Sequence, residues 1–219
     1  KSVTCKVIPM TQDKNYNGCI LRYYLNDGKI YFLLITEKNY TQDDKFDGLK
    51  LHFPGGRCSR RNDFNSHTAS REYLEELNHT YEISSEDIEK MKQRLEKEQR
   101  ILFHSSSYYS LFFLRCDEQE KSEIDANFKL FLSKLNEKER LKFYIESEAI
   151  GIHWILFDDL SLSSIGTDLN VVAVQQAGYF EENGTVSLPI HYHTNWPPIT
   201  SLVKNTVRLI VKHRMLDHL

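Results

Sequence analysis

A glycine turn followed by a helix that carries three carboxylates is the feature that most restricts what this chain can fold into. Residues 53–56 read Phe-Pro-Gly-Gly, and fourteen residues separate them from Arg71. Glu72, Glu75 and Glu76 follow at positions i, i+3 and i+4, which places them on one helical face. Like charges at this spacing destabilise an isolated helix by roughly 0.2–0.5 kcal/mol per pair. The pattern therefore indicates that the three carboxylates bind a cation.

The chemistry of the three glutamates predicts which cation binds. Oxygen ligands without sulfur or imidazole favour a hard divalent ion, so we expect Mg²⁺ or Mn²⁺ as the cofactor. The opposite face of the same helix carries apolar side chains that can anchor it in a core, namely Ala69, Tyr73, Leu74 and Leu77. A surface helix with an acidic face is the simpler alternative, but it does not account for the glycine turn.

This stretch resembles the Nudix box, written G-x5-E-x7-R-E-U-x-E-E-x-G-U with U an apolar residue. Gly56 matches the first glycine, and residues 71–76 match the Arg-Glu-U-x-Glu-Glu core, with Tyr73 at U. The sequence departs from the pattern in three ways. The interval from glycine to arginine is one residue longer, Asp63 stands where the first glutamate would be, and residues 78–79 are Asn-His instead of Gly and an aliphatic residue.

Resemblance to the Nudix hydrolase superfamily implies a fold and several branches of function. The implied fold is an α/β/α sandwich with a mixed sheet, here with helical insertions and a C-terminal helix, in a single domain over residues 1–219. The box spacing and the Phe-Pro-Gly-Gly run are similar to those of vertebrate enzymes that remove caps from snoRNA and mRNA. Large DNA viruses also encode diverged Nudix proteins, described as decapping enzymes or ADP-ribose pyrophosphatases.

The resemblance also implies a reaction and residue roles. Nudix enzymes use water to attack one phosphorus of a diphosphate that links a nucleoside to another group. Glu72, Glu75 and Glu76 are the expected metal ligands, and Glu72 or another nearby acid would take the proton from water. Arg71 would brace the glutamates through ion pairs. Gly55 and Gly56 would bring the backbone close to the metal helix and line the substrate site.

Residues outside the core of the box are further candidates. Glu148, six residues before Trp154, is the preferred additional catalytic acid, with Glu146 as the weaker choice and a solvated loop acid as the simpler interpretation. Arg57 and Arg60 follow the glycines and are suited to binding substrate phosphates, although they could equally be solvated. For Asp63, a favourable position at a helix N-terminus is the simpler account.

The C-terminal segment bears on RNA as a partner. Lys204, Arg208 and Lys212 recur every four residues and could follow an RNA backbone. The solvated side of an amphipathic helix explains the same spacing, because apolar residues occupy the positions between them. His and aromatic residues, including Phe53 and Trp196, could stack on a base, but ordinary packing is the default for each.

Composition limits the remaining function classes. The formal net charge of −3 argues against strong nonspecific binding to nucleic acid. Four cysteines at no metal-binding or redox spacing indicate reduced thiols and an intracellular, cytoplasmic or nuclear location, and no apolar run predicts a membrane span. Three functions stay open: an RNA 5′-cap hydrolase, which we favour, a pyrophosphatase of ADP-ribose or free nucleotides, and a non-catalytic binding module. A homodimer is compatible with each.

Hydrophobic periodicity and turn signals predict the following elements. Asn26-Asp27-Gly28 is a strong hairpin turn signal between two strands. The glycine turn precedes a helix over 66–77. We expect strands at 19–24, 30–36, 49–53, 101–104, 108–116 and 150–157. We expect helices at 84–100 and 123–146, the second with a break near Asn136, and a final helix from 198 to 218. A loop should begin at Asp158.

Overall fold

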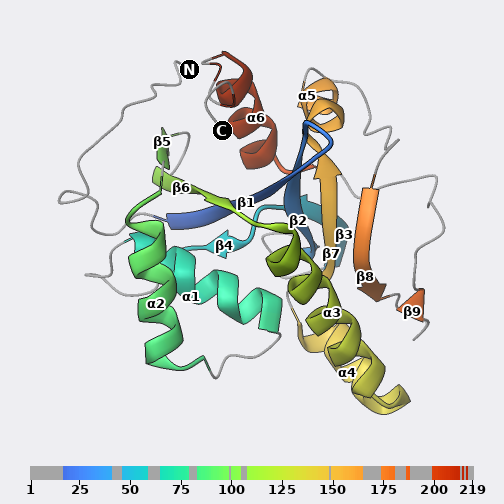
Figure 1. Cartoon of the computed structure of the whole chain (residues 1–219). Coiled ribbons are helices and arrows are strands. Elements are labelled where there is room, and N and C mark those ends of the chain that lie inside the picture. Colours follow the sequence, from blue (N-terminus) through green and yellow to red (C-terminus); the bar gives the residue numbers. More distant parts are fainter. Residues whose placement is uncertain are drawn as a thin grey trace. The chain divides into compact units, whose positions relative to one another are not determined.

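The computed structural model describes residues 17–40, 46–58, 65–78, 83–98, 100–104, 108–147, 149–164, 174–180, 186–187, 199–212, 214 and 216. The chain divides into two compact units, and the division falls inside the first strand. Unit 1 comprises Lys1–Tyr23 and Phe53–Arg115, and unit 2 comprises Tyr24–His52 and Cys116–Leu219. Both units combine helices with strands, which confirms the α/β class (Figure 1). None of the described helices is both long and apolar enough to cross a bilayer.

Unit 1 is built on four strands in the order β5-β6-β1-β4. These strands are β1 (Asn17–Asn26), β4 (Gly55–Gly56), β5 (Arg100–His104) and β6 (Tyr108–Arg115). β1 is parallel to β6 and antiparallel to β4, so the pairing is mixed, as predicted. The strands of this unit contribute buried apolar side chains to its core: Cys19, Ile20, Leu21, Leu111, Phe112 and Phe113.

Two helices of unit 1 lie side by side, α1 (Asn65–Asn78) and α2 (Ser85–Leu95) (Figure 1). Ser84 caps α2 by accepting a 3.1 Å hydrogen bond from the Asp87 amide. α2 ends at Leu95, five residues before the predicted end. The chain enters β5 at Arg100, where it pairs with β6, so tertiary pairing overrides the local helix propensity of this segment.

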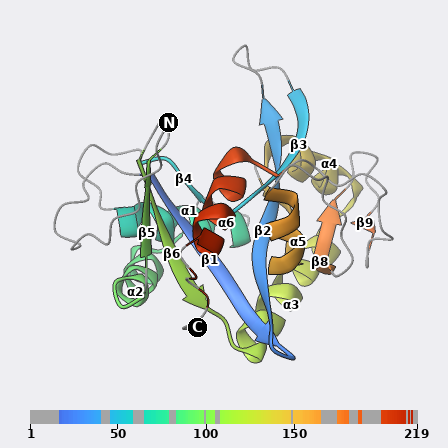
Figure 2. The same ribbon diagram turned by 90° about the horizontal axis from the view of Figure 1, so that it is seen from above.

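Unit 2 contains the antiparallel strand order β3-β2-β7-β8-β9. The bounds of these strands are β2 (Lys29–Tyr40), β3 (Phe46–His52), β7 (Ala149–Leu156), β8 (Val174–Phe180) and β9 (Val186–Ser187). β2 and β3 run together as an antiparallel pair (Figure 2). Every residue of β7 is buried, because it is a central strand between β2 and β8. Asp27 and Gly28 precede β2 with φ values of 50° and 72°, which agrees with the predicted turn.

The described residues of unit 2 include four helices: α3 (Glu118–Lys134), α4 (Glu137–Glu146), α5 (Phe157–Ser164) and α6 (Ser201–Lys212). Asn136 caps α4 with a capping box, which explains the predicted break at this residue. Trp154 on β7 donates a 2.8 Å hydrogen bond to Asp125 on α3. This bond fixes α3 against the central strands of the unit.

Two predictions for the end of the chain were wrong. The segment after Phe157 is a helix rather than a loop, because Asp158 and Asp159 suit the positive end of a helix dipole and Leu160 is buried. The final helix ends at Lys212 rather than at 218. Before it, the Thr200 amide donates a 3.0 Å hydrogen bond to Leu51 of β3, which ties the start of α6 to the sheet of unit 2.

Candidate functional site

The glycine turn of unit 1 forms the short strand β4, which lies against β1. Gly18 pairs with Gly56, Cys19 pairs with Gly55, and the Ile20 amide donates a 2.8 Å hydrogen bond to the Pro54 carbonyl. Gly55 has a φ of 146°, which side chains rarely permit, and a Cβ there would lie 2.3 Å from the Gly18 carbonyl oxygen. This position therefore requires glycine.

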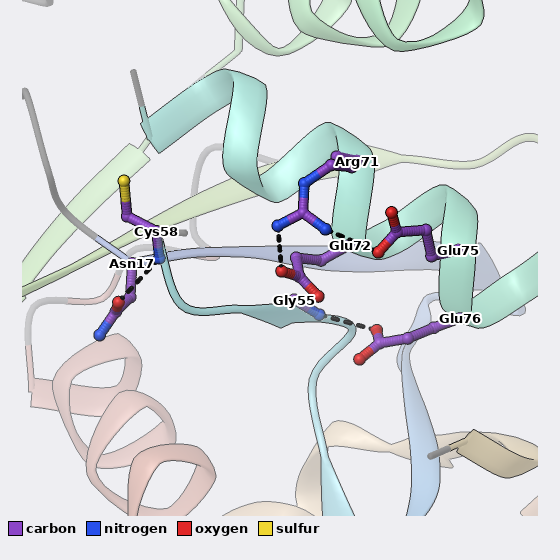
Figure 3. A network of polar contacts seen from close by, with 7 residues as sticks. All are labelled: Asn17, Gly55, Cys58, Arg71, Glu72, Glu75 and Glu76. Carbon is purple, nitrogen blue, oxygen red and sulfur yellow. Dashed lines mark hydrogen bonds and ion pairs between the residues drawn. The ribbon is translucent and has the colours of Figure 1, made fainter. Parts of the chain in front are cut away.

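Helix α1 directs two of its glutamates at β4. A Cβ at Gly56 would come within 2.4 Å of Cδ and 2.6 Å of Oε2 of Glu72, so the carboxylate fills the space that glycine leaves. The Gly55 amide donates a 2.9 Å hydrogen bond to Oε2 of Glu76 (Figure 3). The predicted glycine turn and the predicted acidic helix face thus meet in space, although about twenty residues separate them in sequence.

Arg71 forms ion pairs with two glutamates of the acidic face. Its Nη1 lies 2.7 Å from Oε2 of Glu75, and its Nη2 forms an ion pair with Oε1 of Glu72 (Figure 3). Burial favours the neutral form of Arg71, but the charges and hydrogen bonds of Glu72 and Glu75 outweigh it and raise the guanidinium pKa above its ordinary value. Arg71 is therefore permanently charged and orients both carboxylates.

The side chains of Arg71 and the three glutamates have little exposure to solvent. The Glu72 and Glu75 side chains are 16% and 13% exposed, and Glu76 is 7% exposed. Together with Arg71 they carry a formal net charge of −2 when ionised. The sequence placed Glu76 on the acidic face and Leu74 and Leu77 on the apolar face, yet Glu76 is buried and both leucines are only half-buried. Ala69 and Tyr73 are buried, as predicted.

Within the described part of the chain, no three His, Cys, Asp or Glu side chains converge as a ready-made metal site. Glu72 and Glu75 turn toward Arg71, and Glu76 turns toward the Gly55 amide. The donor set nevertheless fits a hard divalent ion, because it offers only carboxylate oxygens and an excess of negative charge beside a side-chain-free strand. Glu72, Glu75 and Glu76 are the residues that would hold such an ion.

The other predicted site residues are only partly described. Arg57 directly follows Gly56 and is exposed. Arg60, Asp63 and Glu148 lie outside the described residues. Glu146 is the last residue of α4 in unit 2, where its exposed carboxylate lies 3.8 Å from Lys142.

Base-stacking candidates and the basic residues of α6 can be placed in part. Phe53 is fully buried and belongs to the core, while Trp196 lies outside the described residues. On α6, Lys204 is half-buried, and Arg208 and Lys212 are exposed.

Sequence reasoning missed several residues that support the site. Asn17 accepts a 3.2 Å hydrogen bond from the Cys58 amide through Oδ1, which fixes the loop that follows the glycines (Figure 3). Asn65, the first residue of α1, forms a side-chain hydrogen bond with Ser110 of β6. Gly18 of β1, which pairs with Gly56, also supports the site. Its sequence signal is that an isolated glycine inside a strand marks a close backbone approach.

Comparison with known proteins gives distant structural likenesses. No protein-family profile matches this sequence, and no curated protein sequence matches it. One similar solved structure is that of a T. brucei MERS1–RNA complex, with a TM-score of 0.38 and 10% identity over 69% of this chain. The match covers 54% of that protein, so this chain spans about half its length. Another is a C. elegans Ap4A hydrolase binary complex, with a TM-score of 0.24 and 16% identity, covering 55% of this chain and 99% of that one. Both similarities are too low to support a functional argument.

Proposed function

We propose that this chain is a divalent-metal-dependent hydrolase of the Nudix type, which cleaves the diphosphate of a nucleoside-diphosphate-linked substrate. One observation carries the proposal. Two carboxylates of one helix, Glu72 and Glu76, reach the glycine strand β4, while Arg71 holds Glu72 together with Glu75. A solvated acidic helix face would not bury a glutamate against a backbone amide or need a glycine to make room for another.

Each residue of the site has a task in this proposal. A bound Mg²⁺ or Mn²⁺ would neutralise the charge of a diphosphate and make water a better nucleophile. Glu72, Glu75 and Glu76 would hold the ion, and Arg71 and the Gly55 amide keep these carboxylates oriented in its absence. Glu72 would serve as the proton acceptor from within the box. Glu148 stays a candidate for the same task from outside it.

As the substrate we propose the 5′ cap of RNA. The exposed Arg208 and Lys212 of α6, together with the half-buried Lys204, are the cations that would meet the phosphates of an RNA strand. A small nucleotide such as ADP-ribose is the second candidate, favoured by the formal net charge of −3, which weakens long-range attraction of RNA. The same catalytic residues serve either substrate.

A substrate panel tests the proposal. Capped RNA, ADP-ribose and inosine diphosphate would be assayed with Mg²⁺, with Mn²⁺ and with excess EDTA. We expect hydrolysis of at least one diphosphate, lost in EDTA and restored by added metal. Full activity in EDTA would contradict metal dependence. Stoichiometric Mn²⁺ binding without hydrolysis of any substrate would favour the non-catalytic binding module. Faster cleavage of ADP-ribose than of capped RNA would make the small-molecule pyrophosphatase the better proposal.

A further inference from the structure

Three residues on adjacent strands of unit 1 form one row beneath α1. The strand register pairs Gly18 of β1 with Gly56 of β4 on one side and with Ser110 of β6 on the other. Neighbouring strands lie about 4.8 Å apart, so the row extends about 9.6 Å from Ser110 to Gly56. Gly56 is the end of this row that belongs to the candidate site.

Helix α1 meets each residue of the row in turn. The Asn65 side-chain amide donates a hydrogen bond to the Ser110 hydroxyl, and Glu72 lies against Gly56. Between them, the space beside Gly18 is filled by the Asn65 carbonyl oxygen and by Ala69. The seven steps along the helix from Asn65 to Glu72 rise about 10.5 Å, which matches the length of the row. The helix thus crosses the three strands and contacts each of them.

The contact at Gly18 leaves no room for adjustment by side chains. A Cβ there would lie 2.3 Å from the Asn65 carbonyl oxygen and 2.9 Å from the Ala69 amide nitrogen, and both atoms belong to the helix backbone. Ordinary contacts begin near 3.4 Å, so relief requires the backbones of α1 and β1 to move apart by about 1 Å. Because Glu72 and Glu76 belong to the same helix, their carboxylates would move with it.

The hydrogen bond between Asn65 and Ser110 restrains α1 in ways that the close contact at Gly18 does not. Asn65 is 2% exposed and Ser110 is fully buried, so losing one partner would leave a polar group without water. Close packing on glycine restrains the height of a helix above a sheet but restrains sliding less. A buried hydrogen bond at one end of the row restrains both sliding and rotation.

We infer that Gly18 and the Asn65–Ser110 pair are positioning residues, which set where α1 places Glu72 and Glu76 against β4. The inference rests on the proposed function for its catalytic consequence. All three residues act through the position of the helix, and the role assigned to them is not a catalytic one. The signature of this role is a change in metal binding and turnover per folded molecule, in addition to any change in stability.

Gly18→Ala is the principal test. We expect its kcat at saturating Mn²⁺ to fall on the order of a hundredfold, as a shift of about 1 Å in catalytic groups can cause, and its Mn²⁺ affinity to weaken. Mn²⁺ binding would be measured directly from the free-ion EPR signal, and the folded fraction by circular dichroism. Gly48→Ala is the matched control. Gly48 has a φ of 82° with no atom near its missing Cβ, so that variant is strained without a collision against α1.

A geometric measurement tests the inference without relying on activity. The Gly55 amide donates to Glu76, so its hydrogen exchange reports whether that carboxylate stays in place. We expect faster exchange of this amide in Gly18→Ala than in the parent, and unchanged exchange in Gly48→Ala. Unchanged Gly55 protection in a folded Gly18→Ala variant would overturn the inference, whatever the parent protein hydrolyses.

Ser110→Ala provides a second test if Gly18→Ala does not fold. We expect its Mn²⁺ affinity to weaken by about two- to fivefold, the equivalent of one lost hydrogen bond. Ser70→Ala is its control, because Ser70 is equally buried on α1 but donates within the helix, to the Ser66 carbonyl. Equal Mn²⁺ affinity and kcat in Ser110→Ala, Ser70→Ala and the parent would show that the pair has no positioning role. A parent that neither binds Mn²⁺ nor hydrolyses any diphosphate would instead contradict the proposed function.

Discussion

Two helices of this protein, α1 in unit 1 and α6 in unit 2, are held in place by different physical means. The buried residues of α1 are mostly small or polar: Asn65, Ser66, Thr68, Ala69, Ser70, Tyr73 and Glu76. Those of α6 are mostly aliphatic: Leu202, Val203, Thr206, Val207, Leu209 and Ile210. Burial of aliphatic groups stabilises α6 through the hydrophobic effect, which does not depend on the orientation of the groups. Hydrogen bonds and backbone contacts orient α1, as a helix with a chemical task requires.

The first prediction concerns the buried glutamate of α1. Glu76→Gln keeps an oxygen that can accept the hydrogen bond from Gly55, so we expect the variant to fold. It loses a negative charge from the predicted metal ligands, so kcat should fall by about two orders of magnitude or more. Steady-state hydrolysis with Mg²⁺ would measure kcat, and circular dichroism would measure folding. Parent-level turnover would mean that the acidic face of α1 is structural, like the buried face of α6.

The second prediction concerns an aliphatic residue of α6, whose replacement should lower stability but not activity. Ile210 is 1% exposed, and Ile210→Ala removes buried methyl groups and leaves a cavity. The free energy of unfolding should fall by about 2–5 kcal/mol, while kcat for a small diphosphate stays at the parent value where the variant is folded. Urea unfolding and hydrolysis below the transition would test this. A loss of kcat without a loss of stability would show that α6 also has an orienting role.

The third prediction uses a histidine in the dry interior of unit 2. His153 on β7 lies with Nε2 2.5 Å from the Thr36 hydroxyl, and burial lowers its pKa to about 3. Since an unfolded histidine has a pKa near 6.5, the unfolded chain binds a proton that the folded chain excludes. Stability contributed by neutral His153 is present above pH 6.5 and is lost toward pH 3.

Because of His153, the free energy of unfolding should decrease by about 1.4 kcal/mol per pH unit as the pH falls from 6 to 4. Urea unfolding of the parent and of His153→Gln across this range would measure it. The variant should lose less stability per pH unit than the parent, even if it is less stable at pH 7. Identical slopes would mean that other groups cause all of the acid sensitivity.

The fourth prediction, with the smallest expected effect, concerns the exposed side of α6. Replacing Lys204, Arg208 and Lys212 by Gln should weaken binding of capped RNA and lower its salt slope by about 2, since each single-strand phosphate contact contributes about 0.7. Hydrolysis of a cap dinucleotide should barely change. The control replaces Lys129, Lys138 and Lys142 of α3 and α4, which changes the charge equally. Equal effects of both variants would contradict a specific RNA surface on α6.

Local patterns were sufficient to predict most of the described elements and the helical face that carries the three glutamates. The carboxylate spacing in α1, the Asn26-Asp27-Gly28 turn and the break at Asn136 each depend on a few consecutive residues, and each lies in the structure where it was predicted. The predictions failed where distant parts of the chain compete with local preference. β5 shortens α2, and burial of Leu160 makes α5 a helix.

The sequence by itself determined that three glutamates share one helical face, that an arginine precedes them, and that glycines come before the helix. Only the tertiary structure decided how these groups meet. Arg71 holds Glu72 and Glu75, Glu76 turns to the Gly55 amide, and α1 rests on Gly18. The physical reason is strand register. The pairing of β1 with β4 and β6 brings together residues far apart in the chain, and a shift by one residue would turn each of them to the other face.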